Sequence, residues 1–345
     1  MWRLKSEEDG ATAVIVAISL VVLFGMGALV IDVGNLYWER RQLQNGADAA
    51  ALAAAQDLAA GDSAATAEDT ARTYTSANNT RDAYVEDIYQ PTTTSVTVET
   101  ITGDADESGT IASFLASILG VDNYFTQASA TAAWGDIAGA ATIPITICED
   151  AWNHLTGNGT VLPSAGSSIL RIGVPPGQLD ADIDCSNPGG GDVPPGGFGF
   201  LDADANCEAH VATDGWSDGE TGNTPDIAGS SPCDAKDFYD VLIDAVDNGT
   251  KLLIPIFDEY DEQGSSGQYH IIGFGALELR GYTINGGPQH PTYGRSYNWI
   301  HGGSACPGSA SCLDLRFTNF VSLGGDMIPG GGGSDFGASV VRLIL

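Results

Sequence analysis

Residues 30–55 read VIDVGNLYWERRQLQNGADAAALAAA, and they decide the fold because an apolar run ends there and a second helical pattern begins. The run itself, ATAVIVAISLVVLFGMGALVI at residues 11–31, contains no charged side chain. An α-helix of that length measures roughly 31 Å, which matches the hydrocarbon core of a bilayer. The sequence therefore predicts a membrane-spanning helix that continues beyond the membrane.

The flanks of the run fit a retained anchor. Tyr37 and Trp38 follow it at the position of an interfacial aromatic belt. The run is longer than the apolar core of a cleaved signal peptide, so we expect it to remain uncleaved. We predict a cytoplasmic N-terminus over residues 1–10 and a transmembrane helix over residues 11–36. The protein would then be a single-pass protein of the cell membrane with most of its chain extracytoplasmic.

Beyond the membrane, small and apolar residues recur at spacings of three and four, which places them on one face of a helix. These candidate interaction residues are Leu43, Ala47, Ala50, Ala54 and Leu58. Small side chains allow close approach of another element. Two interpretations stay open: the face packs on the protein's own sheet, or it packs against related helices in an assembly. A second helix is expected over residues 63–77.

The rest of the chain predicts an α+β protein. Residues 37–137 are expected to hold the stalk helices and a small pilin-like segment, in which strands at 93–101 and 124–134 flank a helix at 111–120. Residues 138–345 are rich in Gly, Pro and Asp loops between apolar strands, with one amphipathic helix, AKDFYDVLIDAV. We expect them to form a β-rich exported domain whose last strand, 338–345, pairs back onto it.

Charge restricts the class of partner. The chain carries 45 Asp and Glu against 13 Lys and Arg, a formal net charge of −32. Nucleic-acid binding depends on Lys and Arg contacts to phosphate, so this composition excludes a nucleic-acid partner. The acidity instead favours a well-hydrated surface.

The cysteines indicate disulfides formed outside the cytoplasm, since they lie in loops and none forms a C-x-x-C pair or stands near a His at zinc-finger spacing. The six candidates are Cys148, Cys185, Cys207, Cys233, Cys306 and Cys312. Spacing leaves their connectivity open, apart from one local expectation. Cys306 and Cys312 are close enough in sequence to close the small loop CPGSASC.

The phrase LDAD occurs at residues 179–182 and again at 201–204. Oxygen-bearing residues at alternate positions begin a calcium loop, which makes Asp202, Asp204 and Asn206 calcium candidates. Both repeats lack the Gly and the Glu that an EF-hand needs later in the loop. Solvated Asp-rich turns are the simpler interpretation, and we expect no bound metal.

No nucleophile elbow, phosphate loop or dinucleotide-binding motif occurs, and the five His are widely spaced without a metalloprotease motif. We therefore expect no catalytic activity and no cofactor. An anchored hydrolase with a dispersed site stays open as a third hypothesis.

Three features stand in a fixed order: Gly10 before the span, VIDVGNLY at its exit, and R-x-x-L-Q-N-x-A-D-A-A-A-L-A-A-A after it. Together they resemble the N-terminal segment of TadG/TadE-like proteins of the tight-adherence (Flp) pilus system. The resemblance implies a membrane-anchored accessory or minor-pilin-like component of pilus assembly. Its partners would be membrane lipid and other pilus-assembly proteins or pilins.

Two departures narrow that expectation. Pilins cut by prepilin peptidase carry a Glu five residues after the cleaved Gly, but counted from Gly10 that position is Ile15. The D-x-S-x-S metal motif of larger TadG relatives is also missing from the sequence. A processed, polymerising major pilin is therefore disfavoured. The alternative from another class is an anchored surface adhesin or cation-binding envelope module unrelated to pilus building.

Overall fold

The computed structural model describes residues 7–79, 83–102, 111–112, 123–157, 169–174, 185, 198–219, 233, 235–263, 266–285, 289–297, 311–323, 326–327 and 336–344. The chain divides into two compact units. The first contains residues 1–133 and 343–345, and the second contains residues 134–342. Long helices and mostly antiparallel sheets make up the described residues, which confirms the predicted α+β class.

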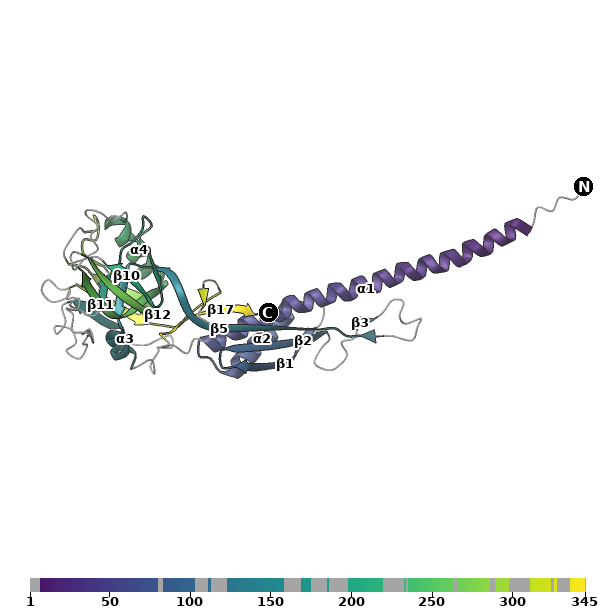
Figure 1. Ribbon diagram of the computed structural model, residues 1–345, viewed down its shortest axis with the longest axis horizontal. Coiled ribbons are helices and arrows are strands. Elements are labelled where there is room, and N and C mark those ends of the chain that lie inside the picture. The colour runs from purple at the N-terminus through teal and green to yellow at the C-terminus, as the bar shows by residue number, and fades with distance from the viewer. Residues whose placement is uncertain are drawn as a thin grey trace, which may run out of the picture. The chain divides into compact units, whose positions relative to one another are not determined.

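Helix α1 spans Glu7–Ala59 without a break over 53 residues (Figure 1), so the predicted continuous helix is confirmed. Its first part is apolar and exposed, with Val21 and Phe24 at 72 % and 73 % exposed. This part is long and apolar enough to cross a membrane. Apart from Ala28, burial begins only at Glu39. The helix thus changes from an exposed apolar rod to a packed element just after Trp38.

Helix α2 spans Ala64–Ala77 and packs against α1. It begins where Ser63 caps it: the Ser63 hydroxyl accepts a hydrogen bond from the Thr66 backbone N–H at 3.2 Å, which satisfies a free donor of the first turn. Its buried residues are Ala67, Ala71 and Thr75. The helix predicted over residues 63–77 is therefore confirmed.

Three strands of the first unit pair antiparallel in the order β1-β2-β5: β1 is Ala83–Thr92, β2 is Ser95–Thr102, and β5 is Gln127–Thr142, of which the part up to Ala133 belongs here. The second part of α1 lies along β2 (Figure 1). The strand predicted at 93–101 corresponds to β2. The strand predicted at 124–134 is divided between the end of a short strand, β4 (Asn123–Tyr124), and the start of β5.

The helix predicted over residues 111–120 is wrong at its start. Ile111–Ala112 form strand β3, which pairs with β4, Asn123–Tyr124, in an antiparallel ladder. Backbone pairing with a neighbouring strand outweighs a weak local helix propensity. Residues 113–120 lie outside the described residues.

The second unit is built on one large sheet, ordered β7-β14-β12-β11-β6-β8, with β10 and β13 also pairing with β12. The bounds are Leu170–Val174 for β7, Ser311–Phe317 for β14, Ser266–Thr283 for β12, Lys251–Gln263 for β11, Ile145–Cys148 for β6, Phe198–Phe200 for β8, Gly215–Gly219 for β10 and Ser296–Tyr297 for β13.

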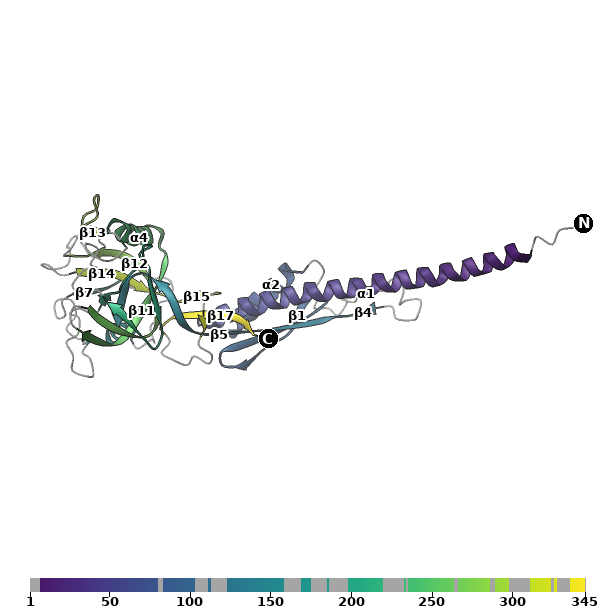
Figure 2. The same cartoon turned by 45° about the horizontal axis from the view of Figure 1, so that its top comes forward.

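Smaller strands and two helices complete this unit. From Trp134 onward β5 pairs with β9, Ala209–Ala212, and with β16, Asp326–Met327. Strand β17, Ala338–Ile344, runs parallel to β15, Phe320–Ser322, so the last strand pairs back as predicted. Helix α3 is Glu149–Thr156, and helix α4, Ala235–Asn248, packs on β12 (Figure 2).

Two disulfides of the second unit lie wholly within the described residues. Cys148 pairs with Cys185, and Cys207 pairs with Cys233. Cys312 is also disulfide-bonded, while Cys306 lies outside the described residues. The core of this unit centres on Trp152, whose ring meets those of Phe317 and Phe336 edge-on at centroid distances of 4.4 and 5.6 Å.

Candidate functional site

The face of small residues on α1 is packed inside the first unit. Leu43 is 1 % exposed, and Ala47, Ala50 and Ala54 are fully buried, while Leu58 is half-buried. The elements that cover α1 over these turns are α2 and β2. In this structure the face is therefore packed against other elements of the same chain. Packing of these residues against related helices in an assembly stays a prediction.

Two other residues of the same segment fix α1 in place. Gln44 donates one hydrogen bond to the Asp48 carboxylate at 2.8 Å and one to the backbone carbonyl of Ser129 on β5 at 3.0 Å. A Cβ at Gly46 would lie 2.3 Å from the side-chain Nδ2 of Asn79. The absence of a side chain at Gly46 therefore leaves space for Asn79, just beyond the end of α2, to lie against α1. Leu43, Gln44 and Gly46 of the L-Q-N-G sequence thus pack or hydrogen-bond within the unit, whereas Asn45 is exposed.

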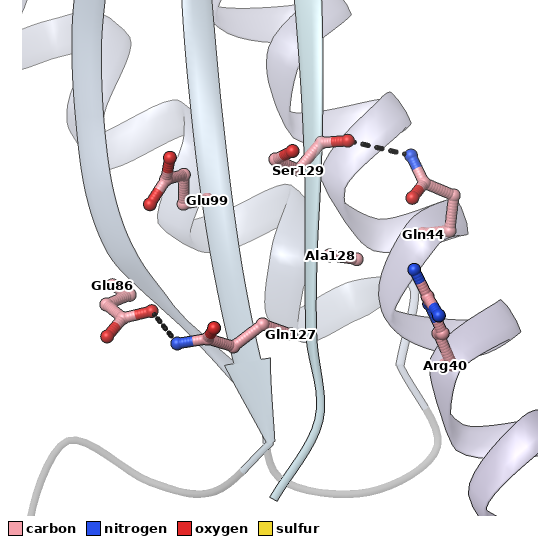
Figure 3. A pocket seen from close by; sticks show the side chains of 7 residues that line it. All are labelled: Arg40, Gln44, Glu86, Glu99, Gln127, Ala128 and Ser129. Atoms are coloured by element: carbon pink, nitrogen blue, oxygen red, sulfur yellow. Dashed lines mark hydrogen bonds between the residues drawn. The ribbon is translucent and has the colours of Figure 1, made fainter.

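A polar pocket of about 250 Å³ lies between α1 and the β1-β2-β5 sheet (Figure 3). Its lining is entirely polar apart from one Ala: Arg40, Gln44, Glu86, Glu99, Gln127, Ala128 and Ser129. Gln127 donates to the Glu86 carboxylate at 2.7 Å, and the Tyr89 hydroxyl approaches Glu99 at 3.4 Å. The pocket therefore combines one guanidinium with two carboxylates.

The pocket lies near the candidate membrane span. Arg40 is two residues beyond the exposed Trp38 on α1, so the pocket adjoins the end of the candidate membrane span. In the sequence, Glu86 and Glu99 belong to no recognisable motif. No sequence pattern could have found them, because the pairing of β1 with β2, which sets Asp87 opposite Glu99, is a tertiary property.

The calcium candidates lie in a tight turn of the second unit. The Asp204 carboxylate accepts hydrogen bonds from the backbone N–H groups of Asn206 at 2.8 Å and Glu208 at 3.1 Å. These two backbone N–H groups hold the pKa of Asp204 below its usual range. His210 Nε2 lies 3.2 Å from the other carboxylate oxygen. The structure thus brings Asp204 and Asn206 together.

Asp202 is not among the groups gathered around this carboxylate in the described chain, and its backbone N–H donates instead to Asp218. The possible metal-ligand atoms that come within 4.8 Å of one another belong to Asp204, Glu208 and His210, and Glu208 and His210 are exposed. Most of the Asp204 acceptor capacity is already used within the turn. Calcium binding by Asp202, Asp204 and Asn206 stays a prediction.

A second carboxylate–histidine pair joins α4 to the segment before β13. His290 is buried, and its Nδ1 accepts the backbone N–H groups of Thr292 and Tyr293. Its Nε2 therefore carries the hydrogen and donates to Asp240 at 3.1 Å. A Lys236 ammonium in hydrogen-bond contact is the main cause that lowers the pKa of Asp240. The pair fastens the segment to α4.

The comparisons with known proteins match one segment of the chain. Residues 10–57 match the family model described as "Putative Flp pilus-assembly TadE/G-like". Neither a curated protein nor a solved structure matches the chain. The matched residues are almost all of α1, including its exposed apolar part and its buried Ala face. The similarity to TadE/G-like proteins of Flp pilus assembly therefore covers the N-terminal segment, residues 10–57.

Proposed function

We propose that this protein is a membrane-anchored accessory or minor-pilin-like component of Flp pilus assembly, with most of its chain outside the cytoplasm. The observation that carries the proposal is the coincidence of the family match with α1. One helix combines an exposed apolar part, suited to lipid and to neighbouring helices, with a part that fixes a folded unit next to it.

The division of α1 defines which residues would meet partners. Exposure of apolar side chains such as Val21, Phe24 and Val30 to water costs free energy. A bilayer or a bundle of helices removes that cost because it takes the apolar surface out of water. The Ala face is already covered. Lateral packing in the assembly would therefore use the apolar surface from Val14 to Trp38.

Two features support the extracytoplasmic placement of the rest of the chain. Disulfides such as Cys148–Cys185 persist in oxidising compartments and are rare in the cytosol. The two bridges in the described part of the chain lie in the second unit, beyond the anchor. A protease added to intact cells should therefore degrade the second unit while leaving a membrane-protected N-terminal fragment.

Electron microscopy of surface pili in a strain lacking this chain tests the proposal, with adhesion scored in parallel and the intact chain restored as the control. Loss of pili that the restored chain reverses is the expected result. Pili that persist while adhesion is lost would move the function to an adhesin-like second unit. If pili and adhesion both persist, the pilus-assembly proposal fails.

The alternative function, a cation-binding envelope module, is favoured by one observation, the grouping of Asp204, Glu208 and His210. It predicts that millimolar Ca²⁺ raises the thermal midpoint of the protein and that Asp204→Ala abolishes this increase. Asp202→Ala distinguishes two modes of binding. It should also abolish the increase if Asp202, Asp204 and Asn206 form the calcium loop, and it should leave the increase unchanged if Asp204, Glu208 and His210 bind the ion. An unchanged midpoint in Ca²⁺ would remove the alternative.

A further inference from the structure

The pocket beside α1 has opposite charges on its two sides. Arg40 extends from α1 on one side, and Glu86 and Glu99 extend from β1 and β2 on the other (Figure 3). Gln127 and Ser129 of β5 stand between them. A ligand that fits this arrangement carries both a negative and a positive group, because complementary charge on each side favours binding.

The positively charged group of the pocket, the Arg40 guanidinium, is available to a ligand. Within the described part of the chain, the Arg40 guanidinium makes no hydrogen bond and no ion pair. The carboxylates have only neutral partners there: Gln127 for Glu86 and Tyr89 for Glu99. A guanidinium presents a planar fork of donors that matches a phosphate or carboxylate. The pocket therefore has an anion-binding group and two cation-binding groups that it does not use on one another.

The depth of the pocket relative to a bilayer identifies a source for such a ligand. Trp38 is exposed at the end of the apolar surface, where interfacial aromatic residues lie at headgroup level. Arg40 follows it by about 3 Å along the helix axis. The polar layer on each side of the hydrocarbon core is about 5–7 Å thick. The pocket thus lies within reach of lipid headgroups when α1 spans a bilayer.

We propose that this pocket binds the zwitterionic headgroup of phosphatidylethanolamine, with the phosphate on Arg40 and the ammonium between Glu86 and Glu99. At about 250 Å³ the pocket suits a small polar group rather than a large ligand. Anionic headgroups that lack an amine would place no positive charge beside the Glu86 and Glu99 carboxylates, which would repel them. A choline headgroup cannot donate hydrogen bonds and is usually held by aromatic rings, and no aromatic side chain lines this pocket.

This inference goes beyond the proposed function and rests only on its membrane-anchoring part. Flotation of the protein with vesicles tests that anchoring separately. A protein that floats but shows no headgroup preference would overturn the pocket assignment and leave pilus assembly untouched. A protein that fails to float would remove the anchor on which both ideas depend.

The test uses the full chain reconstituted in nanodiscs with equal amounts of phosphatidylethanolamine, phosphatidylglycerol and phosphatidylcholine. The lipids that remain bound after gentle detergent release are counted by mass spectrometry. Phosphatidylethanolamine should be enriched, and Arg40→Gln and Glu99→Gln should each reduce the enrichment about fivefold, the upper range for one exposed charge pair. Arg41→Gln is the matched control, because Arg41 is an adjacent, exposed cation that does not line the pocket.

Each contrary result overturns the proposal in a distinct way. Equal retention of the three lipids, or equal losses in Arg40→Gln and Arg41→Gln, would indicate a general interfacial cation. Preference for phosphatidylglycerol would indicate simple charge attraction. If free phosphoethanolamine at the same concentration removes all the retained lipid signal, the ligand is the soluble ester instead. Unchanged thermal unfolding of the variants confirms that they remain folded.

Discussion

The lack of a side chain at Gly275 on β12 leaves space for the Trp152 ring in the core of the second unit. A Cβ at this position would lie 2.6 Å from a ring carbon of Trp152, which is 1 % exposed and held against Phe317. Because that ring cannot move freely, Gly275→Ala should lower the free energy of unfolding by about 1–3 kcal/mol. Urea unfolding measures it. The cost should shrink in a Trp152→Leu background, and strict additivity in this double-mutant cycle would contradict the contact.

Asp204 makes the turn at residues 204–208 sensitive to acid. Its carboxylate accepts the backbone N–H groups of Glu208 and Asn206, which lowers its pKa in the folded protein. The stabilisation of the turn is therefore complete above the ordinary Asp pKa and is lost as the pH falls through the lowered value. NMR of the Asn206 and Glu208 amides against pH should show one transition below the ordinary Asp pKa. The same amides should lack it in Asp204→Asn.

The packed part of α1 predicts how the small-residue face responds to larger side chains. Ala50 is fully buried beneath the elements that cover α1, whereas its neighbour Ala49 is only half-buried. Ala50→Leu should destabilise the first unit by about 1–3 kcal/mol through overpacking. Ala49→Leu is the matched control and should cost less. Thermal unfolding of the full chain in detergent measures both, and equal effects would contradict the burial of this face.

The Cys207–Cys233 bridge joins a turn before β9 to a position two residues before α4, across 26 residues of sequence. Closing a loop of that length restricts the unfolded chain, and removing the bridge should cost about 3 kcal/mol. The double variant Cys207→Ala/Cys233→Ala tests this by denaturant unfolding under oxidising conditions. Intact and variant chains should converge when a reductant opens the bridges. A variant as stable as the oxidised intact chain would contradict a stabilising role.

Elements with strong local signals could be predicted from the sequence, and elements defined by pairing could not. The apolar run and the Ala spacing predict α1, and Ser63 marks the start of α2. Strand β3 begins in a segment with helix-like spacing, and only its pairing with β4 makes Ile111 extended. The pocket could not be predicted from the sequence for the same reason. Packing of α1 on the sheet brings Arg40 and Glu99 together, and no local sequence pattern encodes the register of that sheet.

At the scale of the molecule, the proposed function depends on one helix with two parts, an exposed apolar part and a packed part. The family match ends at residue 57, near the end of α1, so the described strands and disulfides all lie beyond it. The similarity to TadE/G-like proteins is therefore confined to this helix. The second unit, which no comparison matches, is the part that would distinguish this protein from others that share the segment.

The exposed apolar part of α1 gives the most direct prediction for the whole molecule. Arg at the centre of a membrane span costs about 2.5–3.5 kcal/mol on insertion scales, so Val21→Arg/Phe24→Arg should release the chain from the membrane fraction. Both positions are more than 70 % exposed in the structure, and the change should leave the folded units intact. Vesicle flotation measures release, and Val21→Leu/Phe24→Leu is the control that should float like the intact chain.

Expression of the same two variants in a strain lacking this chain connects the anchor to function. If anchoring is required, the Leu variant restores pili and the Arg variant does not. Restoration of pili by an Arg variant that no longer floats would mean that the chain acts without its anchor. An Arg variant that floats like the intact chain would show that α1 is not the membrane attachment, and the apolar surface of α1 would then need a protein partner to cover it.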